Sequence, residues 1–336
     1  MTKLSKISFF LFVTGYNYIW LRVLIFNYFY NKFGGMGIYY TAIMAVAIVL
    51  LFALVPKKLM QHSYEEAYKK SYFKYFYSII ILLENIIGIV FSVYLLSRIF
   101  IPTANFYVML VIVSLAIVAI SYYRPKDIME ISTLFFIVGY GILMLSLFFY
   151  PDLDITYLLP FQGSNYWVLP LFIIMFFGEN LIFLIDKREV NFSKLNFIMA
   201  VFVSILLFGV EYFILICNAG DTIFKGISWV GFISLSIEPI SKYIGNFDFA
   251  YIFYILICCI MRNAYHMSIV RNNMDINHKF MTVLLLATIV ILGSVSFLFI
   301  PFNRFAYMVV AALLLTSASI FVWFLKECYH VRKVKE

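Results

Sequence analysis

The stretch that decides the fold is GIYYTAIMAVAIVLLFALV, residues 37–55, which carries no charged side chain. A helix of about 20 mainly apolar residues crosses the hydrocarbon core of a bilayer, where it satisfies its own backbone hydrogen bonds. Similar runs recur along the chain between charges, Gly and Pro. They predict ten membrane-spanning helices, at about 7–29, 37–55, 75–97, 105–122, 131–150, 167–186, 195–217, 249–270, 280–299 and 305–325.

The composition supports the same fold class. Of the 336 residues, 64% are hydrophobic and 12% are charged, and the mean hydropathy is +0.97. Soluble domains average about 45–50% apolar and about 25% charged residues, and disordered chains are more polar still. We therefore expect an all-α polytopic membrane protein, with residues 1–336 forming a single transmembrane domain.

Basic residues set the predicted orientation. With the N-terminus inside, eighteen of the 25 Lys and Arg residues fall on the cytoplasmic side and five on the outer side. Membrane proteins normally carry this excess inside, so both termini are predicted to be cytoplasmic. Because the net charge of +8 lies mainly at the ends of apolar runs, we expect the lipid bilayer as a partner and no nucleic acid. The outer loop 218–248 is predicted to be either an interfacial helix that caps a substrate pathway or an ordinary connector.

Ionisable side chains at membrane depth are the candidate functional residues, because their burial there is costly. They are Arg22, Glu84, Glu179, Glu211, Arg262 and His266. Three carboxylates nearly balance two guanidinium groups, so we expect ion pairs inside the bundle. Glu211 is close enough to the outer end of its span to reach water, and Arg22 is long enough to extend to an interface.

The first and the sixth predicted spans carry matching interruptions. These are Thr14-Gly15-Tyr16-Asn17 and Gly178-Glu179-Asn180. Spans that unwind at the midplane can bind ligands with their free backbone groups, and paired interruptions are typical of inverted repeats. The sequence therefore predicts a five-plus-five inverted repeat, about 7–150 and 167–325, around a central site. The alternatives are close helix packing at Gly15 and, for Glu179, a purely structural ion pair with Arg262.

Two further helix faces gather small and polar groups through helical spacing. They consist of Glu84, Asn85, Gly88 and Ser92 in the third span, and of Arg262, Asn263 and His266 in the eighth. We expect both faces to point into the bundle. His266 is either a proton carrier near neutral pH or a hydrogen-bonded structural residue.

Motifs of catalytic and cofactor sites do not occur in the sequence. It has no G-x-S-x-G, H-E-x-x-H or Walker motif. The four cysteines lack metal-ligand spacing, and we expect them to act as small hydrophobic residues. The prediction is a protein without enzyme activity, metal or cofactor.

Two segments of the chain resemble a known family. One is DLDITYLLP, residues 152–160, followed by the Phe177-Gly178-Glu179 span, and the other is SIEPISKYIG, residues 236–245. They are similar to segments of the endospore germination permeases, the integral B subunits of nutrient germinant receptors. The chain departs from the family pattern in the first span, which has no proline, and before the eighth, where a basic residue is missing.

The resemblance implies a LeuT-like fold of the amino acid–polyamine–organocation superfamily. It also implies a multi-pass protein of a bacterial cell membrane, here the spore inner membrane. Members associate with an A-type subunit and a lipoprotein C-type subunit. They sense small nutrients such as amino acids, sugars or nucleosides, and they trigger germination.

Our leading hypothesis is a germinant-receptor subunit that binds a small nutrient between the first, third, sixth and eighth spans. The alternatives are a proton-coupled secondary amino-acid transporter of the same fold, and a scaffold whose buried charges only hold helices together. The expected ligand-binding residues are Gly15, Tyr16, Asn17, Glu84, Asn85, Gly178, Glu179, Asn180, Arg262 and Asn263. Glu179 and His266 are the candidates for a proton relay.

Overall fold

The computed structural model describes most of the chain. The described ranges are 3–26, 33–57, 72–95, 105–148, 154–158, 166–184, 190–224, 247–274, 279–299 and 314–326, with the single residues 29, 60, 68, 97 and 311. Every regular element in these ranges is a helix, and the one β contact within them is an isolated bridge between Leu4 and Val190. The all-α prediction is confirmed for this part of the chain.

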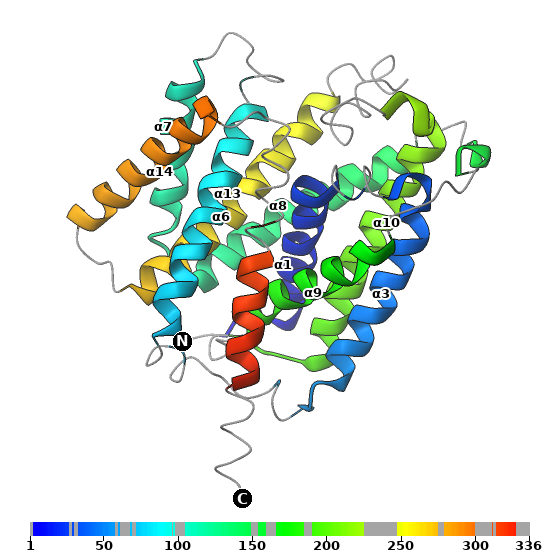
Figure 1. The fold of residues 1–336 in the computed structure, drawn as a ribbon, viewed down its shortest axis with the longest axis horizontal. Coiled ribbons are helices and arrows are strands. Elements are labelled where there is room, and N and C mark those ends of the chain that lie inside the picture. Colours follow the sequence, from blue (N-terminus) through cyan, green and yellow to red (C-terminus); the bar gives the residue numbers. More distant parts are fainter. Residues whose placement is uncertain are drawn as a thin grey trace, which may run out of the picture.

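The helices follow the predicted spans in order (Figure 1). They are α1 (Lys6–Ile19) with the π-helix η1 (Trp20–Ile25), η2 (Gly34–Met36), α3 (Gly37–Leu54), α6 (Phe73–Leu95), α7 (Phe106–Ile120), α8 (Pro125–Phe148), η4 (Ile155–Leu158), η5 (Tyr166–Val168), α9 (Leu169–Asn180), η6 (Leu181–Leu184), α10 (Lys194–Phe224), α13 (Phe247–Asn273) and α14 (Lys279–Phe299). A further helix, Leu314–Lys326, is called the C-terminal helix below. Each of the ten predicted ranges thus contains a helix.

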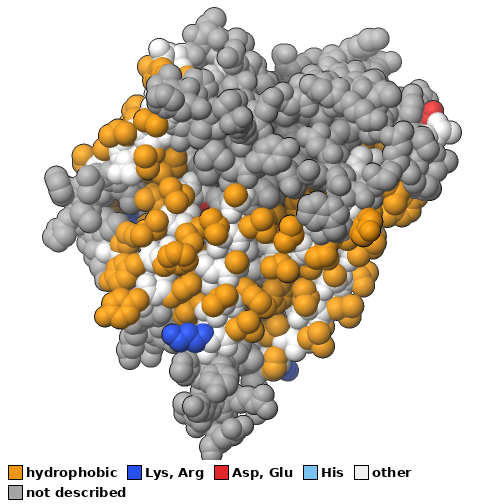
Figure 2. Space-filling model, viewed as in Figure 1, with side chains coloured by type: hydrophobic (Ala, Val, Ile, Leu, Met, Phe, Trp, Pro, Cys, Tyr) orange, Lys and Arg blue, Asp and Glu red, His pale blue; other side chains and the backbone are white. Residues whose placement is uncertain are grey.

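Several of these helices suit a membrane. Gly34–Leu54, Phe73–Val90 and Lys194–Ile214 are each long and apolar enough to cross one, while α7 and α8 pass the same test as a pair bent by 119°. Hydrophobic side chains spread over the described part of the surface seen in Figure 2. On α3, for example, Leu50 and Leu54 are exposed, as lipid-facing residues would be. The described helices therefore fit a helical membrane protein.

Contacts divide most of the helices into two groups. The first group is α1, α3, α9 and α10, in which α10 packs against both α1 and α3, and α3 packs against α9. The second group is α6, α7, α13 and α14, and it lies on the other side of the molecule in Figure 1. α8 contacts α1 and α13, and α1 also contacts α13, so the groups meet along these helices.

The outer loop differs from the prediction at its start. α10 continues to Phe224, seven residues beyond the predicted end of its span at 217. The segment 218–224 contains no proline, so nothing in it interrupts the backbone hydrogen bonds of the helix. The predicted interfacial helix and the family-like segment 236–245 lie outside the described residues.

Candidate functional site

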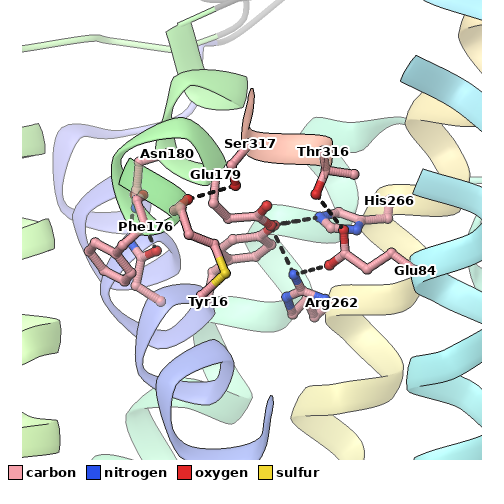
Figure 3. Close-up of polar contacts among 11 residues, drawn as sticks. Tyr16, Glu84, Phe176, Glu179, Asn180, Arg262, His266, Thr316 and Ser317 are labelled. Atoms are coloured by element: carbon pink, nitrogen blue, oxygen red, sulfur yellow. Dashed lines mark hydrogen bonds and ion pairs between the residues drawn. The ribbon is translucent and has the colours of Figure 1, made fainter. Parts of the chain in front are cut away.

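A buried ion network joins three helices at the centre of the fold (Figure 3). The Nη2 atom of Arg262 on α13 donates hydrogen bonds to Oε1 of Glu84 on α6, at 2.7 Å, and to Oε1 of Glu179 on α9, at 2.8 Å. All three side chains belong to residues that are at most 4% exposed. The prediction that carboxylates and guanidinium groups pair inside the bundle is confirmed here.

Two polar rings complete this network. The hydroxyl of Tyr16 on α1 donates to Oε1 of Glu179 and is also hydrogen-bonded to Nε2 of His266. The same Nε2 lies 3.6 Å from Oε1 of Glu179, and the guanidinium carbon of Arg262 lies 4.9 Å from the centre of the Tyr16 ring. Tyr16, Glu84, Glu179, Arg262 and His266 are called the site cluster below. It brings together the four helices that the sequence predicted around a central site.

Helix geometry and neighbouring aromatic rings position the site cluster. Arg262 and His266 are one helical turn apart, so both point to the same side of α13. The ring of Tyr16 contacts the ring of Phe183 edge to face at 5.0 Å, and Phe12 and Tyr265 make a similar contact at 5.2 Å. These rings surround the polar groups with apolar surface, which strengthens the electrostatic interactions among them.

The C-terminal helix closes the site cluster from another side. The hydroxyl of Thr316 donates a hydrogen bond of 3.4 Å to Oε2 of Glu84. The hydroxyl of Ser317 donates a hydrogen bond of 2.6 Å to the carbonyl of Met175 on α9. A segment near the end of the chain therefore holds both α6 and α9 in place (Figure 3).

The unwinding that we expected at Gly15 and Gly178 is not present. α1 continues through Gly15 and α9 through Gly178, and the helix type changes only later, at η1 and η6. A Cβ atom at Gly178 would lie 2.5 Å from the backbone oxygen of Ser317, and one at Gly15 would lie 2.2 Å from the ring of Phe136. Both glycines therefore serve close helix packing, which was the alternative explanation for Gly15.

The two interruptions contact each other through equivalent positions. Asn17 donates to Oδ1 of Asn180 at 2.7 Å, and Asn180 donates to Oδ1 of Asn17 at 3.0 Å. Tyr16 and Glu179, which directly precede these two asparagines, are hydrogen-bonded to each other as well. Both interruptions read Gly-x-Asn, which is the match that the sequence shows between the first and the sixth predicted spans.

The remaining predicted residues line the contact between α6 and α13. Asn85 and Asn263 are both buried, and a Cβ atom at Gly88 would lie 3.0 Å from Oδ1 of Asn263. The expectation that these two helix faces point into the bundle is confirmed.

Three polar groups in or beside the site cluster lack a hydrogen-bond partner among the described residues. They are Nδ1 of His266, Nε of Arg262 and both side-chain amide atoms of Asn85, all of which are buried. A buried polar group without a partner costs about 1–3 kcal/mol. The site is therefore able to form additional hydrogen bonds with a polar ligand.

A second buried ion pair corrects our expectation for Arg22 and Glu211. Nε of Arg22 lies 2.5 Å from Oε1 of Glu211, whose Oε2 accepts a hydrogen bond of 2.6 Å from the hydroxyl of Tyr18. Arg22 is 1% exposed and Glu211 is 6% exposed, so neither extends to water or an interface. Arg22 faces α10 instead of the end of its own helix, and the two charges compensate each other. Tyr18, Arg22 and Glu211 are called the neutral cluster below.

A metal ion is the other occupant that the site cluster suggests. Oxygen and nitrogen atoms of Glu84, Glu179 and His266 lie within 4.8 Å of one another. The guanidinium of Arg262, however, already bridges the Oε1 atoms of both carboxylates. This donor set fits a guanidinium better than a divalent ion.

The cysteines that the structure describes as free and buried are Cys217, Cys258 and Cys259.

The chain was compared with protein-family models and with curated proteins. No family model matches the chain, and no curated protein matches it. The functional conclusion therefore depends on the geometry of the site cluster and on the resemblance of the sequence segments described above.

Proposed function

We propose that this protein is the integral membrane subunit of a spore nutrient germinant receptor, and that it binds a small, amino acid-like nutrient at the site cluster. The observation that carries the proposal is the meeting of α1, α6, α9 and α13 at three buried charges and two polar rings. Ionisable groups at membrane depth are costly and are typically retained for function. The sequence resemblance supplies the class of function.

The unpartnered polar atoms support a polar ligand. Nδ1 of His266, Nε of Arg262 and the amide of Asn85 offer donors and an acceptor within a small buried region. An amino acid carries a carboxylate that accepts hydrogen bonds and an ammonium group that donates them. Such a molecule would satisfy these atoms and would also interact with the charges of the site cluster.

The contacts between helices support ten spans in a five-plus-five inverted repeat. If the first repeat is about 7–150 and the second about 167–325, α1 corresponds to α9, α3 to α10, α6 to α13 and α7 to α14. The contact of α1 with α10 is then matched by that of α9 with α3, and the contact of α13 with α7 by that of α14 with α6. Transporters with inverted repeats bind their ligands where the repeats meet, which is the position of the site cluster.

The same geometry suggests how binding would produce a signal. The ion pair of Arg262 with Glu179 connects the second group of helices to the first. A ligand whose charged groups compete for this ion pair would have one affinity for the state in which the pair joins the two groups of helices. It would have another affinity for the state in which the pair is broken. Such a difference is what allows a ligand to shift a conformational equilibrium. The A-type and lipoprotein C-type subunits of the spore inner membrane would receive this change.

Dipicolinate release from spores tests the proposal. A deletion strain is exposed to amino acids, sugars and nucleosides, and the missing response is restored with the wild-type gene or with variants. Glu179→Gln should fail to restore it at normal protein level, whereas Glu130→Gln, whose side chain is 51% exposed, should restore it fully. A deletion strain that responds normally to every nutrient would overturn the proposal.

A proton-coupled secondary amino-acid transporter of the same fold is the second candidate. The hydrogen-bonded series of His266, Tyr16 and Glu179 favours it, because such a series can carry protons. Proteoliposomes containing the purified protein would then take up an amino acid saturably and only with a pH gradient. Equal uptake with and without the gradient would count against this candidate.

A further inference from the structure

Among the residues that the structure describes, the site cluster contains one negative charge more than its guanidinium can pair. Glu84 and Glu179 share a single guanidinium, that of Arg262, and a neutral imidazole adds no charge. In the neutral cluster, in contrast, one described carboxylate pairs with one guanidinium. An uncompensated charge in a buried site is unfavourable, and binding of a proton or another cation removes it.

We infer that the site cluster takes up one proton, which passes from His266 through the Tyr16 hydroxyl to Glu179. This inference rests on the site of the proposed function and names the ion that the site binds. It applies whether the protein senses its ligand or transports it.

The hydrogen bonds define the direction of the relay. Tyr16 has one hydroxyl proton, which it donates to Oε1 of Glu179. Its oxygen then accepts from Nε2–H of His266, so Nδ1 of that ring carries a lone pair. Nδ1 is buried and has no hydrogen-bond partner among the residues that the structure describes. It is therefore the atom at which a proton can enter.

The transfer balances in protons and bonds. An incoming proton forms an N–H bond at Nδ1 of His266. The Nε2–H bond breaks as its proton passes to the oxygen of Tyr16, and the original hydroxyl proton of Tyr16 passes to Oε1 of Glu179. At the end His266 is neutral and protonated on Nδ1, Tyr16 is again a neutral phenol, and Glu179 is a neutral carboxylic acid.

The surrounding groups identify Glu179 as the end of the relay. The described titratable groups near it are Tyr16 from α1, Tyr77 and Glu84 from α6, and Arg262 and His266 from α13. From the described part of the C-terminal helix, Thr316 and Ser317 add only hydroxyls. Of the two carboxylates, Glu179 is the one to which the Tyr16 hydroxyl is hydrogen-bonded.

A proton fits the charge count better than a divalent metal ion. Two carboxylates, one guanidinium and one proton sum to zero charge, whereas a divalent ion would leave an excess positive charge. That ion would also lie beside the guanidinium of Arg262, and like charges at this distance repel.

Proton uptake would change how the helix groups are connected. A neutral Glu179 leaves Arg262 and Glu84 as a balanced pair, and both of these residues belong to the second group. The pair of Arg262 with Glu179, which joins the second group to the first, loses its charge attraction. The proton therefore acts on the contact between the groups and not within one of them.

Infrared difference spectroscopy of the full chain in lipid nanodiscs tests the inference. After a drop in pH, the wild type should gain a carbonyl band of a protonated carboxylic acid that Glu130→Gln retains and Glu179→Gln lacks. Tyr16→Phe should reach the same final band at least about tenfold more slowly, because a relay group is missing. The matched control is Tyr18→Phe, which removes a buried hydroxyl two residues along α1 and should change neither the band nor its rate.

Several outcomes would overturn the relay. They are a band that persists in Glu179→Gln, a wild-type rate in Tyr16→Phe, and a band that sodium suppresses at constant pH. His266→Gln should be slow like Tyr16→Phe, and it serves as the second variant if Tyr16→Phe does not fold. The band can be present while germination is normal in the deletion strain, which would refute the proposed function and leave the relay intact.

Discussion

Two buried ion clusters lie along α1 and η1, and they differ in charge balance. In each one a tyrosine of α1 donates to a glutamate that also pairs with an arginine. The neutral cluster pairs Arg22 with one described carboxylate, while the site cluster adds Glu84 and His266. A balanced pair needs nothing beyond its own members to hold two helices together. An unbalanced cluster needs a further partner, and this separates a candidate functional site from a structural ion pair.

The largest expected effect comes from removing each arginine. Arg262→Met leaves two buried carboxylates without their cation, whereas Arg22→Met leaves one. Breaking a buried ion pair costs about 3–5 kcal/mol, so Arg262→Met should lower the unfolding temperature of the purified protein more than Arg22→Met. If Arg22→Met lowered the unfolding temperature as much as Arg262→Met or more, the second carboxylate of the site cluster would not depend on Arg262.

The next largest difference between the clusters should come from exchanging the two charged residues of an ion pair with each other. Exchanging Arg22 and Glu211 with each other reverses a one-to-one pair, so the double variant should regain much of the stability lost by either single variant. Exchanging Glu179 and Arg262 places a carboxylate opposite Glu84, and it should regain neither stability nor nutrient response. Thermal unfolding measures the stability of the variants, and dipicolinate release measures their nutrient response. Full recovery after the second exchange would favour the scaffold hypothesis.

Packing at the site cluster should have a smaller effect. Gly178→Ala should destabilise the protein by about 2 kcal/mol, because the added Cβ would meet backbone atoms of Ser317 that cannot move aside. Gly141→Ala is the matched control on α8, where nothing lies within 4 Å of an added Cβ. It should stabilise the helix by about 0.5–1 kcal/mol. Similar unfolding temperatures for the two variants would contradict this account of Gly178.

The smallest difference should come from the two tyrosine hydroxyls. Tyr18→Phe removes one hydrogen bond to a carboxylate, whereas Tyr16→Phe removes the bond to Glu179 and the bond to His266, so the two variants should differ in stability by about 1 kcal/mol. Only Tyr16→Phe should alter the nutrient response, since its hydroxyl belongs to the site cluster. An altered response in Tyr18→Phe at normal protein level would remove the distinction between the clusters.

Much of the helix layout could be predicted from the sequence, because apolar runs of membrane-spanning length are visible there. The pairing of Glu84 and Glu179 with Arg262 could also be anticipated, since charges at membrane depth need partners. The choice of partner could not be predicted where it depends on how a helix is rotated. Arg22 faces α10 and Glu211, and no sequence pattern shows that rotation.

The role of Tyr16 was only partly visible in the sequence. Aromatic residues make up 20% of the chain, so composition does not single out one tyrosine as the link between Glu179 and His266. Gly15 and Gly178 were correctly placed near the site but were expected to unwind their helices. Close neighbours on α8 and on the C-terminal helix account for both glycines, and such tertiary contacts are not readable from local sequence.

The most direct test of the account is ligand-induced stabilisation of the purified protein in lipid nanodiscs, measured against a panel of amino acids, sugars and nucleosides. The account predicts that at least one nutrient raises the unfolding temperature of the wild type and of Tyr18→Phe, and that it has no effect on Glu179→Gln. An equal rise in Glu179→Gln would contradict the assignment of the site cluster. The absence of any rise in the wild type would contradict nutrient binding by this chain.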